Sequence, residues 1–328
     1  MTPKFFFPFN NKLDFLNIEK IRQLKNCKIV YFFPEEHSKI IEDEQNIKII
    51  EEILTNNNSH LEIWLGNYED NDRRLKNLDV SSNLISIINW PYYLLKKTYN
   101  NFLTHCSKKE NIKYLFLCLN RRQSLHKCIL IDEIFKRNLQ KYGKISWLKR
   151  DHCFNEYNFQ YFDDSHLIID SNYQLQMFEK NRNILYKDVL VDLVAETSID
   201  VKDISEKTWF SILYKNVPLI LGHQGIYEKL TSFGIQTHSF FDYSFDQETD
   251  LNTKINLILG NIENIINCDI QEMYLESQKI LDQNYQVVED LAKADSNIPK
   301  KLKEYRKKYS NKYHLLDYYY RVGKGIDV

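Results

Sequence analysis

The sequence predicts an α/β fold in two domains, and three observations carry this prediction. The chain has 328 residues, a length typical of two domains. Short apolar runs of strand length alternate with longer segments whose apolar residues recur at helical spacing, which is the pattern of βαβ units. Glycine and proline are scarce, with eight and six residues, so long flexible linkers are not expected.

The first domain is predicted over residues 1–107, with alternating strands and helices between residues 25 and 105. The expected strands are 28–33, 61–65 and 84–90. The expected helices are 38–54, where isoleucines recur at near-helical spacing, and 92–103, where Pro91 suits the first helical position. A polar stretch at 107–111 places the domain boundary there.

The second domain is predicted over residues 108–298 and repeats the alternation. The expected strands are 114–119, 145–148, 189–195 and 218–221. The expected helices are 125–139, one that opens at Ser205, 226–233 and 251–266. Beyond residue 270 the chain is charged and helical, and Pro299 starts a separate basic helical tail over 299–328.

Composition narrows the possible partners and the compartment. The net charge of −1 gives no basic excess, so no nucleic-acid partner is expected. The six cysteines form no C-x-x-C pair, so we expect no zinc site and a reducing, cytoplasmic location. No stretch approaches the ~20 apolar residues of a spanning helix. A peripheral contact with the inner membrane stays open, because aromatic and basic residues can bind an interface; the basic tail is more simply a solvated helical face.

The segment 189–221 holds the candidate ligand site. A strand is followed by a loop with Glu196, then by a helix that opens with Ser205, Glu206 and Lys207, and then by a second strand. In βαβ units ligands bind beyond the carboxyl ends of the strands, where helix N-termini favour phosphate. Lys207 adds a positive charge there, and Glu196 and Glu206 could accept hydrogen bonds from sugar hydroxyls. Alternatively, Ser205 is an ordinary N-cap, Glu206 a favoured first-turn residue and Lys207 a solvated side chain.

The same segment resembles the donor-site signature of the fucosyltransferase-like glycosyltransferases, which have the GT-B fold. That signature reads F-E-N-S, a short gap, Y-V-T-E-K, a helix, and a G-x-V-P-V-x-x-G strand. The similarity covers about thirty residues, and it keeps the Glu-Lys pair as Glu206 and Lys207. Ala195, Thr197 and Asp203 stand where the family has Phe, Asn and Tyr. The resemblance implies that Glu206 and Lys207 contact the ribose and the phosphate of a nucleotide-sugar donor.

A second polar loop follows the predicted strand 114–119. Asn120, Arg121 and Arg122 lie between this strand and the next helix, where an anion would bind. The resemblance implies an arginine one helical turn further on, near His126 or Lys127. We expect Arg122 or Lys127 to contact the donor diphosphate. The alternative is that both arginines are solvated loop residues.

The resemblance implies two Rossmann-like domains that face each other across a cleft, with a helical C-terminal segment. The C-terminal half would hold a nucleotide-diphosphate sugar, with a GDP-sugar favoured, and the N-terminal half would face a glycan or glycolipid acceptor. No D-x-D motif is present at the predicted site, so transfer without a metal or other cofactor is expected. Surface-polysaccharide synthesis is the destination that the family suggests.

A catalytic base, if the transfer inverts, would come from the N-terminal domain. Four residues at or near predicted strand ends are candidates, and Glu36 and His37 are preferred over the other two, Glu35 and Glu62. For each of them a solvated turn is the simpler interpretation. The alternative function is a non-catalytic nucleotide- or glycan-binding protein on the same scaffold, which would keep Glu206 and Lys207 and lack the base.

Overall fold

The structure is a computed structural model that describes the following parts of the 328-residue chain: 2–6, 22–23, 25–33, 44–66, 85–90, 95, 98–100, 102–103, 109, 111–120, 124–147, 157–163, 165, 167, 185–197, 199 and 204–293. It divides into two compact units. Unit 1 comprises Met1–Lys96 and Asp295–Val328, and unit 2 comprises Lys97–Ala294. The division falls before the predicted boundary at residue 107, and the predicted tail 299–328 groups with unit 1. That the tail is helical stays a prediction, because it lies outside the described residues.

Side-chain contacts explain why the division falls at Lys97. The residues that follow are helical and pack within unit 2. The hydroxyl of Tyr99 donates a hydrogen bond to Glu289. The ring of Phe102 lies edge-on to Tyr214, with the ring centroids 5.0 Å apart. The polar stretch at 107–111 therefore falls inside unit 2, and the change of unit comes earlier.

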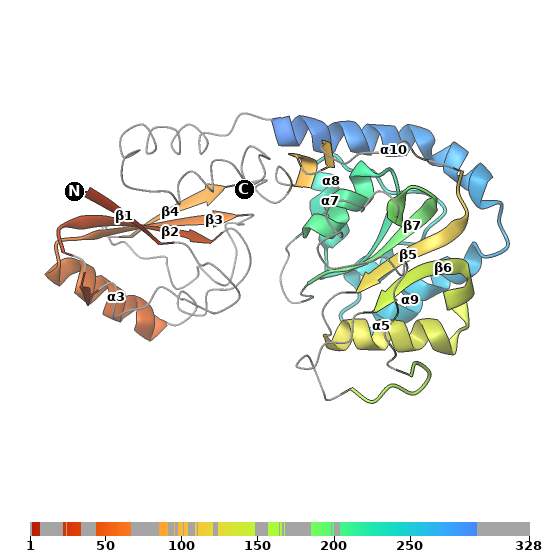
Figure 1. Cartoon of the computed structure of the whole chain (residues 1–328), viewed down its shortest axis with the longest axis horizontal. Helices are drawn as coiled ribbons and strands as arrows, with labels where there is room; N and C mark the ends of the chain where they lie inside the picture. Colours follow the sequence, from red (N-terminus) through yellow and green to blue (C-terminus); the bar gives the residue numbers. More distant parts are fainter. Residues whose placement is uncertain are drawn as a thin grey trace. The chain divides into compact units, whose positions relative to one another are not determined.

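Unit 1 contains a four-stranded parallel sheet in the order β1-β2-β3-β4 (Figure 1). Its strands are β1 Thr2–Phe6, β2 Cys27–Phe33, β3 His60–Gly66 and β4 Ile85–Trp90. Helix α3, Glu44–Asn56, connects β2 to β3 and buries Ile50, Ile53 and Leu54. The predictions of β2, α3, β3 and β4 are confirmed, with α3 described only from residue 44. Strand β1 was not predicted.

Unit 2 contains a second four-stranded parallel sheet, in the order β6-β5-β7-β8. Its strands are β5 Tyr114–Asn120, β6 Gly143–Trp147, β7 Val189–Ala195 and β8 Val217–Leu221. From β5 the chain first moves outward to β6, and then returns to the other side of β5 to form β7 and β8. This reversal between β5 and β7 is a topological switch point, where open α/β sheets bind ligands. Every residue of β7 is buried, including Asp192, the one polar residue in its otherwise apolar run.

Helices cover both faces of this sheet, as parallel strands require (Figure 1). The helices are α5 Leu125–Lys136, α7 Glu206–Leu213, α8 Ile226–Ser232, α9 Leu251–Asn264 and α10 Ile270–Lys293. Helices α7 and α10 pack together on one face, and α5 and α9 pack together on the other. An α/β fold with parallel sheets is therefore confirmed, and the α/β pattern of unit 2 matches the predicted elements closely.

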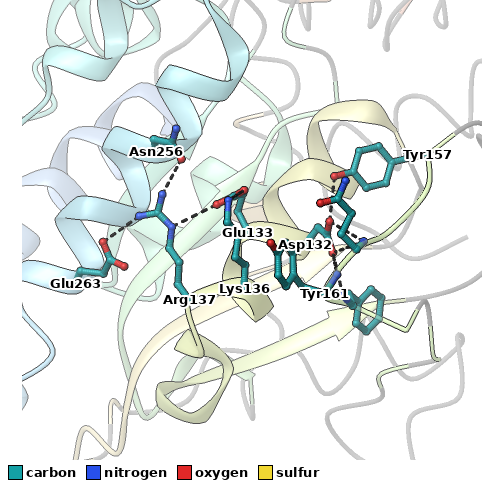
Figure 2. Close-up of polar contacts among 10 residues, drawn as sticks. Asp132, Glu133, Lys136, Arg137, Tyr157, Tyr161, Asn256 and Glu263 are labelled. Carbon is teal, nitrogen blue, oxygen red and sulfur yellow. Dashed lines mark hydrogen bonds and ion pairs between the residues drawn. The ribbon is translucent and has the colours of Figure 1, made fainter.

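Two polar contacts of α5 fix its surroundings (Figure 2). The guanidinium of Arg137 donates to Glu263 and Asn256 of α9, at 2.9 and 2.6 Å. The buried carboxylate of Asp132 accepts hydrogen bonds from the backbone N–H groups of residues 160, 161 and 162, at 2.8 to 3.2 Å. Asp132 thus holds the segment 157–163, whose Phe159 and Phe162 pack against Trp147 at the end of β6. Arg137 and Asp132 tie α5 to its neighbours on both sides.

Candidate functional site

The candidate site lies at the switch point of unit 2, at the carboxyl ends of β5 and β7. Asn120 is the last residue of β5, and Glu196 directly follows β7. The helices that follow these two strands, α5 and α7, begin at the same edge of the sheet. A hydrogen bond of 2.9 Å crosses the switch point, from Nε2 of His126 on α5 to the backbone carbonyl of Glu196. Because a carbonyl can only accept, Nε2 of His126 carries the proton.

Glu196 is the central side chain of this site, and it is 1% exposed. Its Oε1 accepts hydrogen bonds from the backbone N–H of Ser205, at 3.1 Å, and from the hydroxyl of Thr208, at 2.7 Å. Its Oε2 is buried and has no hydrogen-bond partner within the part of the chain that the structure describes. Glu196 was expected to accept hydrogen bonds from ligand hydroxyls, and this stays a prediction. Among the described residues, one of its oxygens holds the start of α7, and the other has no partner and could accept such a bond.

The helix start 205–207 is arranged around Lys207. Ser205 is the N-cap of α7, and its hydroxyl accepts from the backbone N–H of Lys207 at 3.3 Å, as predicted for an ordinary cap. The ammonium of Lys207 donates to the carbonyl of Ala195 at 3.1 Å and to the hydroxyl of Thr197 at 3.4 Å. Lys207 and Glu206 are half-buried. The cation is therefore held over the end of β7, beside Glu196, and is not a freely solvated lysine.

The loop after β5 is described only in part. Asn120 is buried; its side-chain amide donates to the thiol of Cys118 at 3.2 Å, and its Oδ1 is unpaired among the described residues. Lys127, expected at the diphosphate, is 3% exposed and sits on the first turn of α5, where its charge acts on the buried Cys118. Arg121 and Arg122 lie outside the described residues, as do the base candidates Glu35, Glu36 and His37. Glu62 lies within β3, and its side chain is outside the described part of the structure. The predicted roles of all these residues stay predictions.

The four helix N-termini at this edge differ in how they are capped. The buried Asp246 accepts from the backbone N–H of Tyr227 at 3.2 Å and so caps α8, while Asp250 accepts from Thr253 at 2.8 Å and caps α9. The N-cap of α5, Ser124, makes no capping hydrogen bond with its side chain, and its hydroxyl instead lies 3.3 Å from the ring nitrogens of His126. Since protein carboxylates already occupy α8 and α9, the end of α5 is the better place for a ligand anion.

Lys254, which also lies at this edge, was missed in the sequence. The buried ammonium of Lys254 donates to the carbonyl of Gly222, at the end of β8, at 3.2 Å. Burial lowers the pKa of Lys254 and raises the pKa of Asp246. A side chain at Gly222 would press on Glu196, whose Cγ would lie 3.3 Å from the added Cβ. The ends of β7 and β8 are therefore closely packed, and Gly222 is the signal in the sequence that could have indicated this approach.

In comparisons with known proteins, no family model, no curated protein and no solved structure gave a significant match to the chain. The resemblance to the fucosyltransferase-like family stays a prediction. Among the described residues, no three His, Cys, Asp or Glu side chains come together as a group that could hold a metal ion. None of the described helices is both long and apolar enough to cross a bilayer.

Proposed function

We propose that unit 2 binds a nucleotide-diphosphate sugar at the carboxyl edge of its sheet, and that the chain is a glycosyltransferase. The observation that carries this proposal is the Oε2 of the buried Glu196, which has no partner among the described residues and lies at the switch point beside Lys207. A buried acceptor without a partner is costly, and a ligand hydroxyl would satisfy it. A cation and an acceptor at one sheet edge suit a ligand that carries both phosphate and hydroxyl groups.

The chemistry would follow from these side chains. Lys207 and the uncapped start of α5, with Arg121 or Arg122 and Lys127, would face the diphosphate. Positive charge there stabilises the negative charge that develops on the leaving diphosphate, a task that a metal ion performs in other enzymes. Glu196, and Glu206 in the first turn of α7, would accept hydrogen bonds from ribose or sugar hydroxyls. A GDP-sugar is the favoured donor, by resemblance.

The two α/β units suit a GT-B arrangement in which unit 2 holds the donor and unit 1 faces a glycan or glycolipid acceptor. Both units have parallel sheets, and the chain begins and ends in unit 1. A base on unit 1, with Glu36 or His37 as the candidates, would take the proton of the acceptor hydroxyl. Surface-polysaccharide synthesis and a cytoplasmic site of action belong to the same proposal.

Thermal unfolding with a nucleotide panel tests the proposal. GDP, UDP, CMP, CDP, ADP and dTDP are compared, each with and without Mg²⁺. We expect one nucleotide to raise the melting temperature without Mg²⁺, because a ligand that binds only the folded state stabilises it. Lys207→Ala should lose this shift, and Lys279→Ala, on the exposed face of α10, should keep it. If no nucleotide stabilises the wild-type chain, the proposed site is wrong.

An activity assay separates the enzyme from a binding protein on the same scaffold. The nucleotide sugar of the selected base is incubated with the chain, and release of free nucleotide is measured with and without a glycan acceptor. Release that depends on Lys207 supports the transferase. Tight binding without hydrolysis or transfer supports the non-catalytic alternative.

A further inference from the structure

Helix α7 docks on β7 through two polar positions that are buried in the core. Asp192, in β7, and Glu196, directly after it, lie on the same face of the sheet, because side chains in a strand alternate between faces and the backbone N–H of Glu196 still pairs with Leu221 of β8. On α7, Thr208 and Ser211 are one turn apart and also share a face. Thr208 bonds to Glu196 at 2.7 Å, and Ser211 and Asp192 are the buried polar residues of the second position. The carboxyl of Asp192 is therefore the inner neighbour of the candidate ligand site.

Asp192 has little to stabilise a charge within its own contacts. It is 3% exposed, and neither its Oδ2 nor the hydroxyl of Ser211 has a hydrogen-bond partner of normal geometry among the described residues. Burial raises the pKa of Asp192 to about 8. The carboxyl is thus poised to gain or lose a proton when the surrounding charges change.

Charged and titratable groups reach Asp192 from each element packed against it. Lys207, on α7, favours the carboxylate, and Glu196, on β7 itself, disfavours it. Lys109, ahead of β5, also favours it; burial lowers the pKa of Lys109 to about 7, and its ammonium donates to the carbonyls of Tyr186 and Val189 at 3.0 and 2.8 Å. The thiol of Cys118, on β5, is buried nearby, and burial raises its pKa to about 12. Of these groups, Lys207 and Glu196 lie at the proposed ligand site, and Lys207 is the cation of the two.

We propose that Asp192 is a positioning residue of this site: an anionic nucleotide that pairs with Lys207 drives the buried Asp192 carboxylate to take up a proton. The ligand adds negative charge and screens the charge of Lys207, and both effects favour the neutral carboxyl. Asp192 acts through Lys207 and need not touch the ligand. This inference rests on the proposed function, because it requires a nucleotide at Lys207.

The coupling has a sign that can be measured. A ligand that raises the affinity of Asp192 for a proton binds more tightly when the proton is present. Nucleotide affinity should therefore weaken as pH rises through 7 to 9, by about tenfold for each unit by which binding raises the pKa. Near the middle of that window, a one-unit rise corresponds to an uptake of about half a proton per nucleotide.

Isothermal titration calorimetry of the full chain with GDP tests the inference. At each pH between 7 and 9, two buffers with different ionisation enthalpies give the number of protons taken up. We expect uptake by the wild type, no uptake and a pH-independent Kd for Asp192→Asn, and wild-type behaviour for Asp290→Asn, the same change on the exposed face of α10. Ser211→Ala should move the uptake to higher pH, because the serine hydroxyl lowers the pKa of Asp192. A merely structural contact between Ser211 and Asp192 would not change the pH at which proton uptake is half complete.

The outcomes separate this inference from the proposed function. GDP binding by the wild type without proton uptake overturns the inference alone, and so does uptake that persists unchanged in both Asp192→Asn and Ser211→Ala. If Asp192→Asn does not fold, the proton uptake of the wild type and of Ser211→Ala still tests the inference. If the wild type binds none of the panel nucleotides, the proposed function falls, and this inference falls with it.

Discussion

Single side chains at the switch point divide their work between fold and ligand, and Glu196 shows this most clearly. Its two oxygens have different tasks, so Glu196→Gln can separate them. The glutamine carbonyl can still accept from Ser205 and Thr208, whereas the amide nitrogen replaces the unpaired Oε2 and cannot accept. We expect a folded protein whose nucleotide-sugar affinity falls about 10- to 100-fold, since a hydrogen bond to a charged group contributes about 1.5–3 kcal/mol. Calorimetry checks this, with Glu276→Gln on α10 as the control; unchanged affinity in Glu196→Gln would contradict it.

A second single-residue effect comes from His238, in the loop after α8. Burial lowers the pKa of its imidazole to about 4, and its Nε2 has no partner among the described residues. Between the usual pKa of 6.5 and 4, the unfolded chain takes up a proton that the folded chain refuses, so stability falls as pH falls. The loss across this window is on the order of 3 kcal/mol. Urea unfolding from pH 7 to 4 should show that the free energy of unfolding depends less on pH in His238→Gln than in the wild type. An equal dependence in both proteins would rule out this role of His238.

At the scale of elements, α5 is fixed by an interior carboxylate rather than by its surface ion pairs. Asp132→Asn keeps the shape of the side chain and one acceptor oxygen, but its amide nitrogen would replace the oxygen that accepts from the backbone N–H of residue 160 at 3.0 Å (Figure 2). We expect a loss of about 1–3 kcal/mol in the free energy of unfolding, because this buried site loses an acceptor. Amide exchange at residues 160–162 should speed up. Arg137→Gln, which removes partly exposed ion pairs of the same helix, should cost under about 1 kcal/mol.

The elements that the sequence predicted well are those whose burial is uniform. Strand β7 was predicted with its observed bounds, because seven consecutive residues are buried and all of them except Asp192 are apolar. Strand β1 was missed, because Thr2–Phe6 is short and holds Pro3, and its pairing with β2 depends on residues 25 positions away. Local patterns could not supply that pairing.

The candidate site shows the same limit. Ser205, Glu206 and Lys207 follow one another in the sequence, and the cap at Ser205 could be predicted from residue types alone. Asp246 and Lys254 come to the sheet edge from outside the βαβ unit, so no short motif contains them. The division of Glu196 into a structural and an unpaired oxygen also depends on where α7 packs. The sequence therefore indicated that the site lies at the carboxyl edge of the sheet. The hydrogen-bond partners of its side chains follow only from the tertiary structure.

For the whole molecule, two units with separate sheets predict a local response to nucleotide. A ligand at the switch point of unit 2 should slow amide exchange at the ends of β5 and β7 and in the first turns of α5 and α7, because it binds only the folded form of that edge. At a ligand concentration of 100 times Kd the stabilisation is about 2.7 kcal/mol, which slows exchange through opening of unit 2 about 100-fold. Peptides from β2 and α3 of unit 1 are the internal control and should change far less. Hydrogen–deuterium exchange of the full chain with and without GDP measures both, and Lys207→Ala should remove the protection. Equal protection of both units, or protection that survives in Lys207→Ala, would place the nucleotide elsewhere.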